Sequence, residues 1–431
     1  SSHNVSSRIV KREESEDDAS REKVNTDLFS KLPPSDGMFN DLPLYYKTKP
    51  IYSTYSCVGE NFRNDAWLFR SCHFRNLCFD VSNRSFVLFQ SKQDQILNNL
   101  QQINKSITHL SSIGTLSVSL GGINPKWRRG TRSQLEWFPR LQFTSPPDGY
   151  YELPLNTVWV PFHSFAGYNV GHLIWDDFFP IYKLLQMFDL LDHQNHILTK
   201  LELKLWGACD WNPKRKDSCV QTLNKFQSAM GVDRISSVNS TDHDFQMFGL
   251  KKSRYICSPH GAAGLGMLTD HGLKMHGWDE EDWQSTYNAG RGHIFYNFRN
   301  FMLQNLKIPV NTVFTPPYQI YFSRFSSSTQ GRVKGFQKQE HALKRALNNR
   351  HNVTLAGERL SRLSLHEQAE IASKTAIFIT VVGGGSMTAT FLPRGASLIL
   401  FYEAKGGRKR DRDTGLPARL DWDLLNHASH L

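Results

Sequence analysis

One stretch near the C-terminal end, residues 373–403, constrains the fold more than any other part of the sequence. Two apolar runs in it, Thr375–Val382 and Ala396–Tyr402, are each short enough to be a buried strand and are bounded by turn-forming residues. Between them lie a glycine turn, Gly383–Ser386, and a segment compatible with a short helix, Met387–Leu392. The order strand, turn, helix, strand is the repeating unit of a parallel α/β sheet. The sequence therefore predicts an α/β fold.

The glycine turn in this stretch is the first candidate for a ligand site. A glycine-rich turn that opens a helix leaves backbone N–H groups available, and the helix dipole adds positive potential, so a phosphate group can bind there. The alternative is a tight turn whose glycines supply positive φ angles, since the spacing matches neither well-known nucleotide fingerprint. The residues of this candidate site are Gly383, Gly384, Gly385, Ser386, Met387 and Thr388.

The size and charge of the chain narrow the classes of function. At 431 residues, with 39% hydrophobic and 12% aromatic residues, the chain is long and apolar enough for two folded domains. Its formal net charge of +11 is compatible with nucleic acids, anionic membranes or phosphate-bearing small molecules as partners. The basic residues form only small clusters without a recognisable nucleic-acid motif, so we expect no nucleic-acid partner.

The N-terminal part differs in composition from the rest. Residues 1–43 are polar and charged with few aromatic residues, which indicates a flexible stem rather than part of a core. The chain starts without Met and has no signal peptide, and no run of about 18 apolar residues occurs in it. We therefore expect a trimmed ectodomain, whose only tie to a membrane is an anchor or signal upstream of this sequence, as in a type II membrane protein.

The cysteines and the glycosylation triplets favour the secretory lumen. The six cysteines form an even set without CxxC spacing, which argues for disulfides and against a zinc site. Buried thiols are the alternative. The N-glycosylation triplets begin at Asn4, Asn83, Asn104, Asn239 and Asn352. The pairings that we expect are Cys72–Cys78, Cys209–Cys219 and Cys57–Cys257.

Apolar patterns place strands and helices along the rest of the chain. Strands are expected within 67–80 and at 85–89, 158–163, 201–205, 253–257 and 318–323. Helices are expected at 172–191, 295–305, 337–349 and 365–373, and Pro180 marks a kink in the first of them or the start of a new helix. The glycine-rich segment Ser258–Gly266 is expected to be an interdomain turn, and a second ligand loop is the alternative. Prolines near residue 310 mark a boundary. We expect an N-terminal α/β domain at 44–310 and a C-terminal Rossmann-like domain at 311–431, whose tail packs back on the first.

His172, Asp176 and Asp177 form the first candidate catalytic group. On a helix, His172 and Asp176 are four residues apart and share a face, so an imidazole–carboxylate pair can form and act as a general base. The alternative is a buried histidine that only ties down the start of the helix. Asp176 and Asp177 diverge by about 100° on a helix, which argues against a shared metal ion.

Arg324 and Arg332 are candidates for contacts with phosphate oxygens. Both follow the expected strand 318–323 and are separated by a serine-rich loop, and the planar fork of a guanidinium suits phosphate oxygens. A solvated loop is the alternative. Further along, Ser364 and Glu367 occupy the positions of a helix capping box, which accounts for the polar residues there.

Together these residues resemble glycosyltransferase family 61, in particular the animal enzymes that add N-acetylglucosamine to O-mannosylated proteins or to EGF domains. The resemblance runs from Cys57 to Tyr402, with a loose middle. The matching pieces are the Cys-His-Phe-Arg-Asn-Leu-Cys stretch at 72–78, Asn169 with His172, Asp176, Asp177 and Pro180, Tyr321–Arg324 with Arg332, and Thr388 with Phe391–Ala396.

That resemblance implies a GT-B fold, in which two Rossmann-like domains face each other across a cleft and the C-terminal one holds most of the nucleotide sugar. It implies an inverting reaction with a UDP-sugar donor, a glycan or glycoprotein acceptor and no essential metal or other cofactor. Arg324, Arg332 and the turn Gly383–Ser386 would face the diphosphate. His172, with Asp176 or Asp177, would be the base or support it. Such enzymes work in the lumen of the Golgi or the endoplasmic reticulum.

One position departs from the family pattern. The family has His-Gly-Ala at the end of the central strand, where this chain has Val382-Gly383-Gly384, and the missing histidine often helps to hold the nucleotide sugar. Two hypotheses follow. One is a transferase whose donor is UDP-GlcNAc, UDP-xylose or UDP-arabinose, and the other is a non-catalytic relative that binds a carbohydrate or a nucleotide. The presence of Arg324, Arg332 and His172 favours the transferase.

Overall fold

The structure, a computed structural model, describes separate ranges of the chain. These are residues 52–59, 67, 70–92, 116–120, 136–146, 150–164, 167–191, 200–208, 213–237, 254–264, 292–323, 336–347, 352–381, 384–401, 425 and 428. The chain divides into two compact units, Ser1–Lys49 and Pro50–Leu431, and the described residues all belong to the second. The predicted stem therefore lies outside them, and the predicted boundary between residues 310 and 311 stays a prediction.

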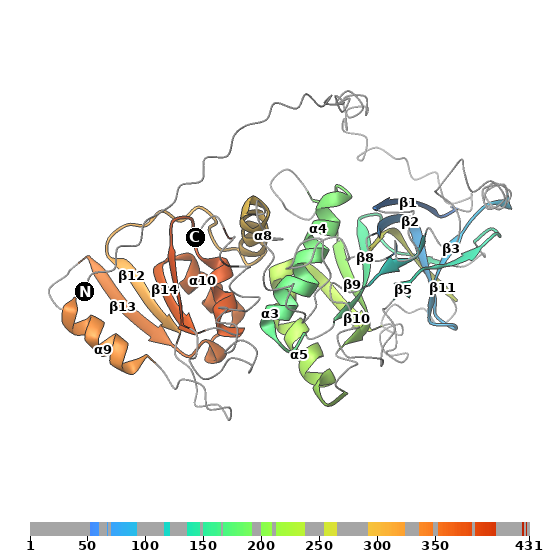
Figure 1. Cartoon of the computed structure of the whole chain (residues 1–431). Coiled ribbons are helices and arrows are strands. Elements are labelled where there is room, and N and C mark those ends of the chain that lie inside the picture. The colour runs from blue at the N-terminus through green and yellow to red at the C-terminus, as the bar shows by residue number, and fades with distance from the viewer. Residues whose placement is uncertain are drawn as a thin grey trace, which may run out of the picture. The chain divides into compact units, whose positions relative to one another are not determined.

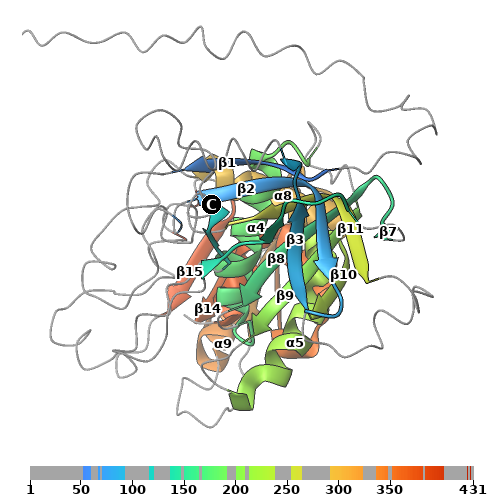
Figure 2. The same cartoon turned by 90° about the vertical axis from the view of Figure 1, so that its right-hand side faces the viewer.

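A nine-stranded sheet makes up the N-terminal part of the described chain (Figures 1 and 2). Its strands are β1 (Thr54–Gly59), β2 (Arg70–Asp80), β3 (Ser85–Phe89), β6 (Arg140–Gln142), β7 (Tyr151–Glu152), β8 (Thr157–Ser164), β9 (Lys200–Ala208), β10 (Val232–Ser237) and β11 (Tyr255–Ala263). They lie in the order β10-β9-β8-β11-β2-β3-β6, with β1 beside β2 and β7 beside β11. A small sheet pairs β4 (Val118–Ser119) with β5 (Glu136–Trp137).

Most strand pairs of the large sheet are parallel, which fits the predicted α/β class. Strands β10, β9, β8 and β11 run parallel to one another, whereas β2 runs antiparallel to β11. Strand β8 is buried on both faces, because Val158 and Val160 lie in the core that includes helices α4 (Phe179–Met187) and α8 (Gly292–Asn305), while Trp159 packs edge-on against Phe86. Burial on both faces explains why its sequence is a continuous apolar run without alternation.

The second sheet contains only parallel strands, in the order β13-β12-β14-β15. Its elements are β12 (Tyr318–Ser323), α9 (Gln337–Ala346), β13 (Val353–Glu358), η7 (Leu360–Arg362), α10 (Leu365–Ser373), β14 (Thr375–Val381), η8 (Gly384–Phe391) and β15 (Ser397–Phe401). Figure 1 shows α9 and α10 on either side of it. Successive residues of β12 point to opposite faces of this sheet. Phe322 packs against Phe336, which precedes α9, whereas Tyr321 lies in the core that contains Ala369 of α10.

The main hydrophobic core is shared by both sheets. It contains Val158 of β8, Phe298 of α8 and Phe378 of β14, all fully buried, and Leu425 and Ala428 near the C-terminus join it. Helix α5 (Lys216–Phe226) contributes through its buried apolar face. None of the described helices is both long enough and apolar enough to cross a bilayer.

Several predicted elements are confirmed. Strand β12 and helix α10 have the predicted bounds, and the predicted capping box forms between Ser364 and Glu367 at the start of α10. The segment after the glycine turn is helical but has 3₁₀ rather than α geometry. Strands β10 and β13 were not predicted, because their short and half-polar sequences lack a clear apolar run.

The predicted interdomain turn at Ser258–Gly266 is wrong, because strand β11 continues through it as far as Ala263. Its small residues allow neighbouring strands to pack closely. A Cβ atom on Gly261 would lie 2.4 Å from Cδ2 of Leu77, and one on Gly264 would lie 2.3 Å from the carbonyl oxygen of Arg70. Gly264 also has a φ of +108°, which favours glycine. The glycines therefore serve close packing between β11 and β2.

The predicted pairings Cys72–Cys78 and Cys57–Cys257 are also wrong. The disulfides join Cys57 to Cys72 and Cys78 to Cys257. Each pair lies directly opposite in an antiparallel ladder, the first between β1 and β2 and the second between β2 and β11. Cys72 and Cys78 lie on one extended strand, which carries them apart. Cys219 is disulfide-bonded too, and its predicted partner, Cys209, lies outside the described residues.

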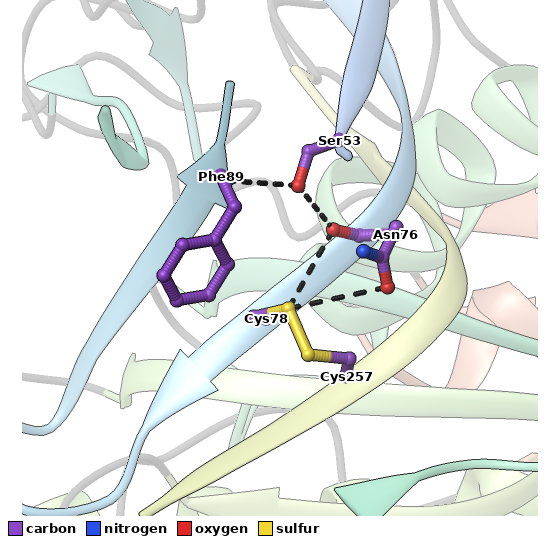
Figure 3. The surroundings of a disulfide bond; sticks show 5 residues. All are labelled: Ser53, Asn76, Cys78, Phe89 and Cys257. Atoms are coloured by element: carbon purple, nitrogen blue, oxygen red, sulfur yellow. Dashed lines mark hydrogen bonds between the residues drawn. A yellow bond between two sulfur atoms is a disulfide. The ribbon is translucent and has the colours of Figure 1, made fainter. Parts of the chain in front are cut away.

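Close to the disulfide Cys78–Cys257, Ser53 also links β2 to β3 by hydrogen bonds (Figure 3). The hydroxyl of Ser53 donates to the carbonyl oxygen of Asn76 at 2.7 Å and accepts from the backbone N–H of Phe89 at 2.9 Å. Asn76 has a φ of +55°, which marks a local irregularity in β2. The bridge Cys78–Cys257 is thus set in a well-connected part of the sheet.

Removal of this bridge should destabilise the protein more than removal of the shorter one. The sequence separation is 179 for Cys78–Cys257 and 15 for Cys57–Cys72, so the first restricts the unfolded chain more. We expect the double substitution Cys78→Ala with Cys257→Ala to cost about 2–5 kcal/mol of unfolding free energy. Urea unfolding of both double variants measures the difference, and a larger loss for Cys57→Ala with Cys72→Ala would contradict it.

Candidate functional site

The predicted helix at 172–191 has an irregular start that shapes the candidate site. It consists of α3 (Val170–His172), a π-helical turn η4 (Leu173–Phe178) and α4. Pro180 lies in the first turn of α4, where its ring would clash with the carbonyl of Asp176 in a regular α-helix. The wider π turn just before it removes that conflict. The predicted helix start at Pro180 is therefore confirmed, since α4 begins at Phe179 directly after the π turn.

The imidazole–carboxylate pair expected from the spacing forms on this segment. Nδ1 of His172 lies 2.6 Å from Oδ2 of Asp176. The Asp176 side chain is 1% exposed and that of His172 is 17% exposed, so the pair is anchored in the core and opens to solvent at the ring. The helix start is fixed by Asn169, whose side chain accepts a hydrogen bond from the backbone N–H of Gly171. In this arrangement Nδ1 of His172 faces the buried carboxyl group, and the imidazole is the part of the pair that reaches solvent.

Asp177 does not join this pair. Its Oδ2 accepts a hydrogen bond of 2.5 Å from the hydroxyl of Ser164, the last residue of β8. Burial raises the pKa of the Asp177 carboxyl to about 8, against a smaller opposite effect of the Ser164 hydroxyl. The two neighbouring carboxyl groups thus have different partners. Among the residues that the structure describes, no group of three or more His, Cys, Asp and Glu side chains is placed to hold a metal ion.

The glycine turn lies next to the helix start that carries His172. A Cβ atom on Gly171 would lie 3.4 Å from Cγ of Met387 in η8, so the backbone of Gly171 packs against the Met387 side chain. The side chains of Met387 and Thr388 are both buried, and Thr388 donates a hydrogen bond to Oε1 of Gln368 in α10. Their side chains therefore hold η8 in place. Of the predicted turn, Gly384, Gly385 and Ser386 form the start of η8 and Ser386 is fully buried, while Gly383 lies outside the described residues.

Arg324 and Arg332 both lie outside the described residues. Strand β12 ends one residue before Arg324, and β12 runs parallel to β14, whose end leads into the glycine turn. The carboxyl ends of both strands therefore share one edge of the second sheet. Ligands of parallel α/β sheets bind at that edge.

Three residues of this region escaped prediction: Ser164, Gly167 and Arg299. Arg299 is fully buried in α8, where it donates to the carbonyl oxygens of Val310 at 2.8 Å and Phe391 at 3.4 Å. Burial lowers the pKa of its guanidinium to about 10. Arg299 thus ties α8 to the end of η8. Its only signal in the sequence is the single arginine in a helix rich in aromatic residues, whereas Ser164 and Gly167 show none.

Comparisons with known proteins agree with the sequence resemblance. Residues 283–399 match the family model described as Glycosyltransferase 61. A curated relative, protein O-linked-mannose beta-1,4-N-acetylglucosaminyltransferase 2 of Xenopus laevis, is 21% identical over 335 residues, which are 77% of this chain. The chain spans about half the length of that relative, 50%.

Two solved structures of the iron-containing dodecameric transferase TibC give weak matches. The complex of heptosyltransferase TibC with ADP-D-beta-D-heptose covers 67% of this chain and 71% of its own, with 13% identity and a TM-score of 0.24. TibC from enterotoxigenic E. coli H10407 covers 68% and 74%, with 11% identity and a TM-score of 0.25. The match is carried by sequence: residues 283–399 match the glycosyltransferase 61 model, which supports the family resemblance.

Proposed function

We propose that this chain is an inverting glycosyltransferase, which moves a sugar from a UDP-sugar to a hydroxyl group of a glycan or glycoprotein. One observation carries most of the weight. The His172–Asp176 pair, with its 2.6 Å contact, lies on a helix start that packs against η8, the 3₁₀ helix that begins within the glycine turn. A base beside a phosphate-binding turn is the arrangement that glycosyl transfer from a nucleotide sugar requires.

In the proposed reaction His172 is the general base. When the Nδ1–H group of His172 donates to Asp176, the lone pair of the neutral ring lies on Nε2. Nε2 takes the proton of the acceptor hydroxyl while the hydroxyl oxygen bonds to the anomeric carbon of the donor. The bond from that carbon to the phosphate oxygen breaks at the same time, and UDP leaves with the electron pair. Attack from the side opposite to UDP inverts the anomeric centre.

The donor would bind at the edge of the second sheet in a GT-B arrangement. Arg324, Arg332 and the backbone of Gly383–Ser386 would stabilise the charge on the departing diphosphate, and no essential metal is then required. The name of the curated relative makes UDP-GlcNAc the first donor to test, before UDP-xylose and UDP-arabinose. Disulfides on both sides of β2 support a location in the lumen of the Golgi or endoplasmic reticulum.

A thermal-shift panel of the purified protein against UDP, GDP, CMP and UDP-sugars tests the donor class. A ligand that binds only the native state raises the unfolding midpoint by mass action. We expect a shift with UDP and with one UDP-sugar, and that sugar names the donor. If no ligand shifted the midpoint, the result would contradict the transferase. It would favour a carbohydrate-binding relative that lost its nucleotide site when valine replaced histidine at position 382.

Arg324→Ala and Arg332→Ala should each weaken binding of UDP. Each substitution removes charge-assisted hydrogen bonds to the diphosphate, so we expect the Kd for UDP to rise about 10- to 100-fold. Isothermal titration calorimetry measures it, and Arg345→Ala on the exposed side of α9 is the matched control. Wild-type affinity in both variants would place the nucleotide elsewhere.

A further inference from the structure

We propose that Ser164 and Asp177 form a positioning pair, which fixes the π turn and thereby holds His172 and Asp176 in register for proton transfer. Asp177 then takes no direct part in the reaction. This role rests on the function proposed above, because it concerns the geometry of the proposed base.

The contacts of Asp177 point away from the reacting groups. Its side chain is enclosed in the core, and its Oδ2 meets the Ser164 hydroxyl at 2.5 Å across a gap of 13 residues in sequence. Ser164 itself is fully buried at the end of β8. The hydrogen bond therefore joins the end of a central strand to the middle of the π turn, one residue from Asp176.

The protonation state of Asp177 agrees with a supporting role. Burial raises the pKa of its carboxyl to about 8, so the group is mostly neutral at pH 7. A neutral carboxyl group neither accepts the proton of a substrate nor holds a cation, but it can both donate and accept hydrogen bonds. The same burial would penalise a charge here and favours a fixed, uncharged link between β8 and η4.

Gly167 leaves the space that this link needs. A Cβ atom on Gly167 would lie 2.5 Å from Oγ of Ser164 and 3.7 Å from Oδ2 of Asp177. Any side chain there would push the Ser164 hydroxyl away from the carboxyl group. The glycine at position 167 thus leaves room for the Ser164–Asp177 contact.

The test compares Ser164→Ala, Asp177→Ala and Asp177→Asn in turnover and in the tautomer of His172. Without the Ser164–Asp177 hydrogen bond, the His172–Asp176 pair should be held less firmly in its reactive position. We therefore expect kcat to fall roughly 10- to 100-fold in both alanine variants, with little change in KM for the donor. Asp177→Asn can still bond to Ser164 and should restore kcat to within about threefold of the wild type. If Asp177 acted as a base or ligand, the amide would be as inactive as the alanine.

Spectra of ¹⁵N-labelled histidine provide a readout that needs no substrate. The contact with Asp176 favours the Nδ1–H tautomer of His172, and the signal is assigned by its loss in His172→Ala. We expect a smaller Nδ1–H fraction in Ser164→Ala and Asp177→Ala, but not in Asp177→Asn. Thr157→Val is the control, because it removes a buried hydroxyl from the opposite end of β8.

The two readouts separate this role from the proposed function. If the alanine variants showed an altered His172 tautomer but the wild type transferred no sugar, the positioning role would be supported and the transferase function rejected. An unchanged tautomer in all variants would overturn the positioning role, whether or not the chain is active. A general structural weakness would lower the unfolding midpoint and leave the tautomer of His172 as in the wild type, which also counts against the proposal.

Discussion

Replacing His172 by alanine should reduce turnover about 10²- to 10⁴-fold and leave the affinity for UDP nearly unchanged. The substitution removes the group proposed to accept the proton of the acceptor hydroxyl. The donor contacts are expected elsewhere, on the second sheet and the glycine turn. The fall should therefore appear in kcat and not in the Kd for UDP, which single-turnover assays and calorimetry measure separately.

His366→Ala is the matched control for this substitution. His366 lies on the outer face of α10 with its side chain 51% exposed, so its loss should change neither turnover nor UDP affinity. Asp176→Asn should also lower kcat, because an amide cannot stabilise the imidazolium that forms. A fully active His172→Ala variant would mean that the histidine only ties down the start of the helix.

The sequence predicted best what depends on neighbours along the chain. Strand β12 and helix α10 were predicted to the residue, because a compact apolar run and a capping box are local signals. The pair His172–Asp176 was also predictable, since a spacing of four residues survives in a helix whose next turn is π-helical. These features need no knowledge of the rest of the fold.

What escaped prediction depends on contacts between distant segments. Glycines at 261 and 264 have the local character of a turn, but burial against β2 keeps them in strand β11. The pairing Cys78–Cys257 follows from the register of β2 and β11, which no spacing of cysteines reveals. For the same reason the sequence grouped Asp177 with His172, whereas the end of β8 brings Ser164 to it.

The pH dependence of stability should carry the signature of Asp177. The pKa of its carboxyl is raised from 3.8 to about 8 in the folded protein, so the folded chain holds a proton that the unfolded chain releases above about pH 4. This contribution to stability is fully present below that pH and is lost as the pH rises through about 8. About four pKa units correspond to a contribution on the order of 5 kcal/mol.

Asp177→Asn isolates this contribution, because the amide does not titrate and keeps the contact with Ser164. We expect the variant to gain stability relative to the wild type steadily as the pH rises from 5 to 8, as measured by urea unfolding at each pH. Other groups act in the opposite direction: burial lowers the pKa of His73 to about 4, so its neutral form favours folding as the pH rises. The contribution of His73 is the same in the wild type and in Asp177→Asn, so it cancels in the difference between their unfolding free energies. If the stability of the two proteins changed equally with pH, the pKa of Asp177 would not be raised and its carboxyl group would be ionised at neutral pH. That result would contradict the prediction.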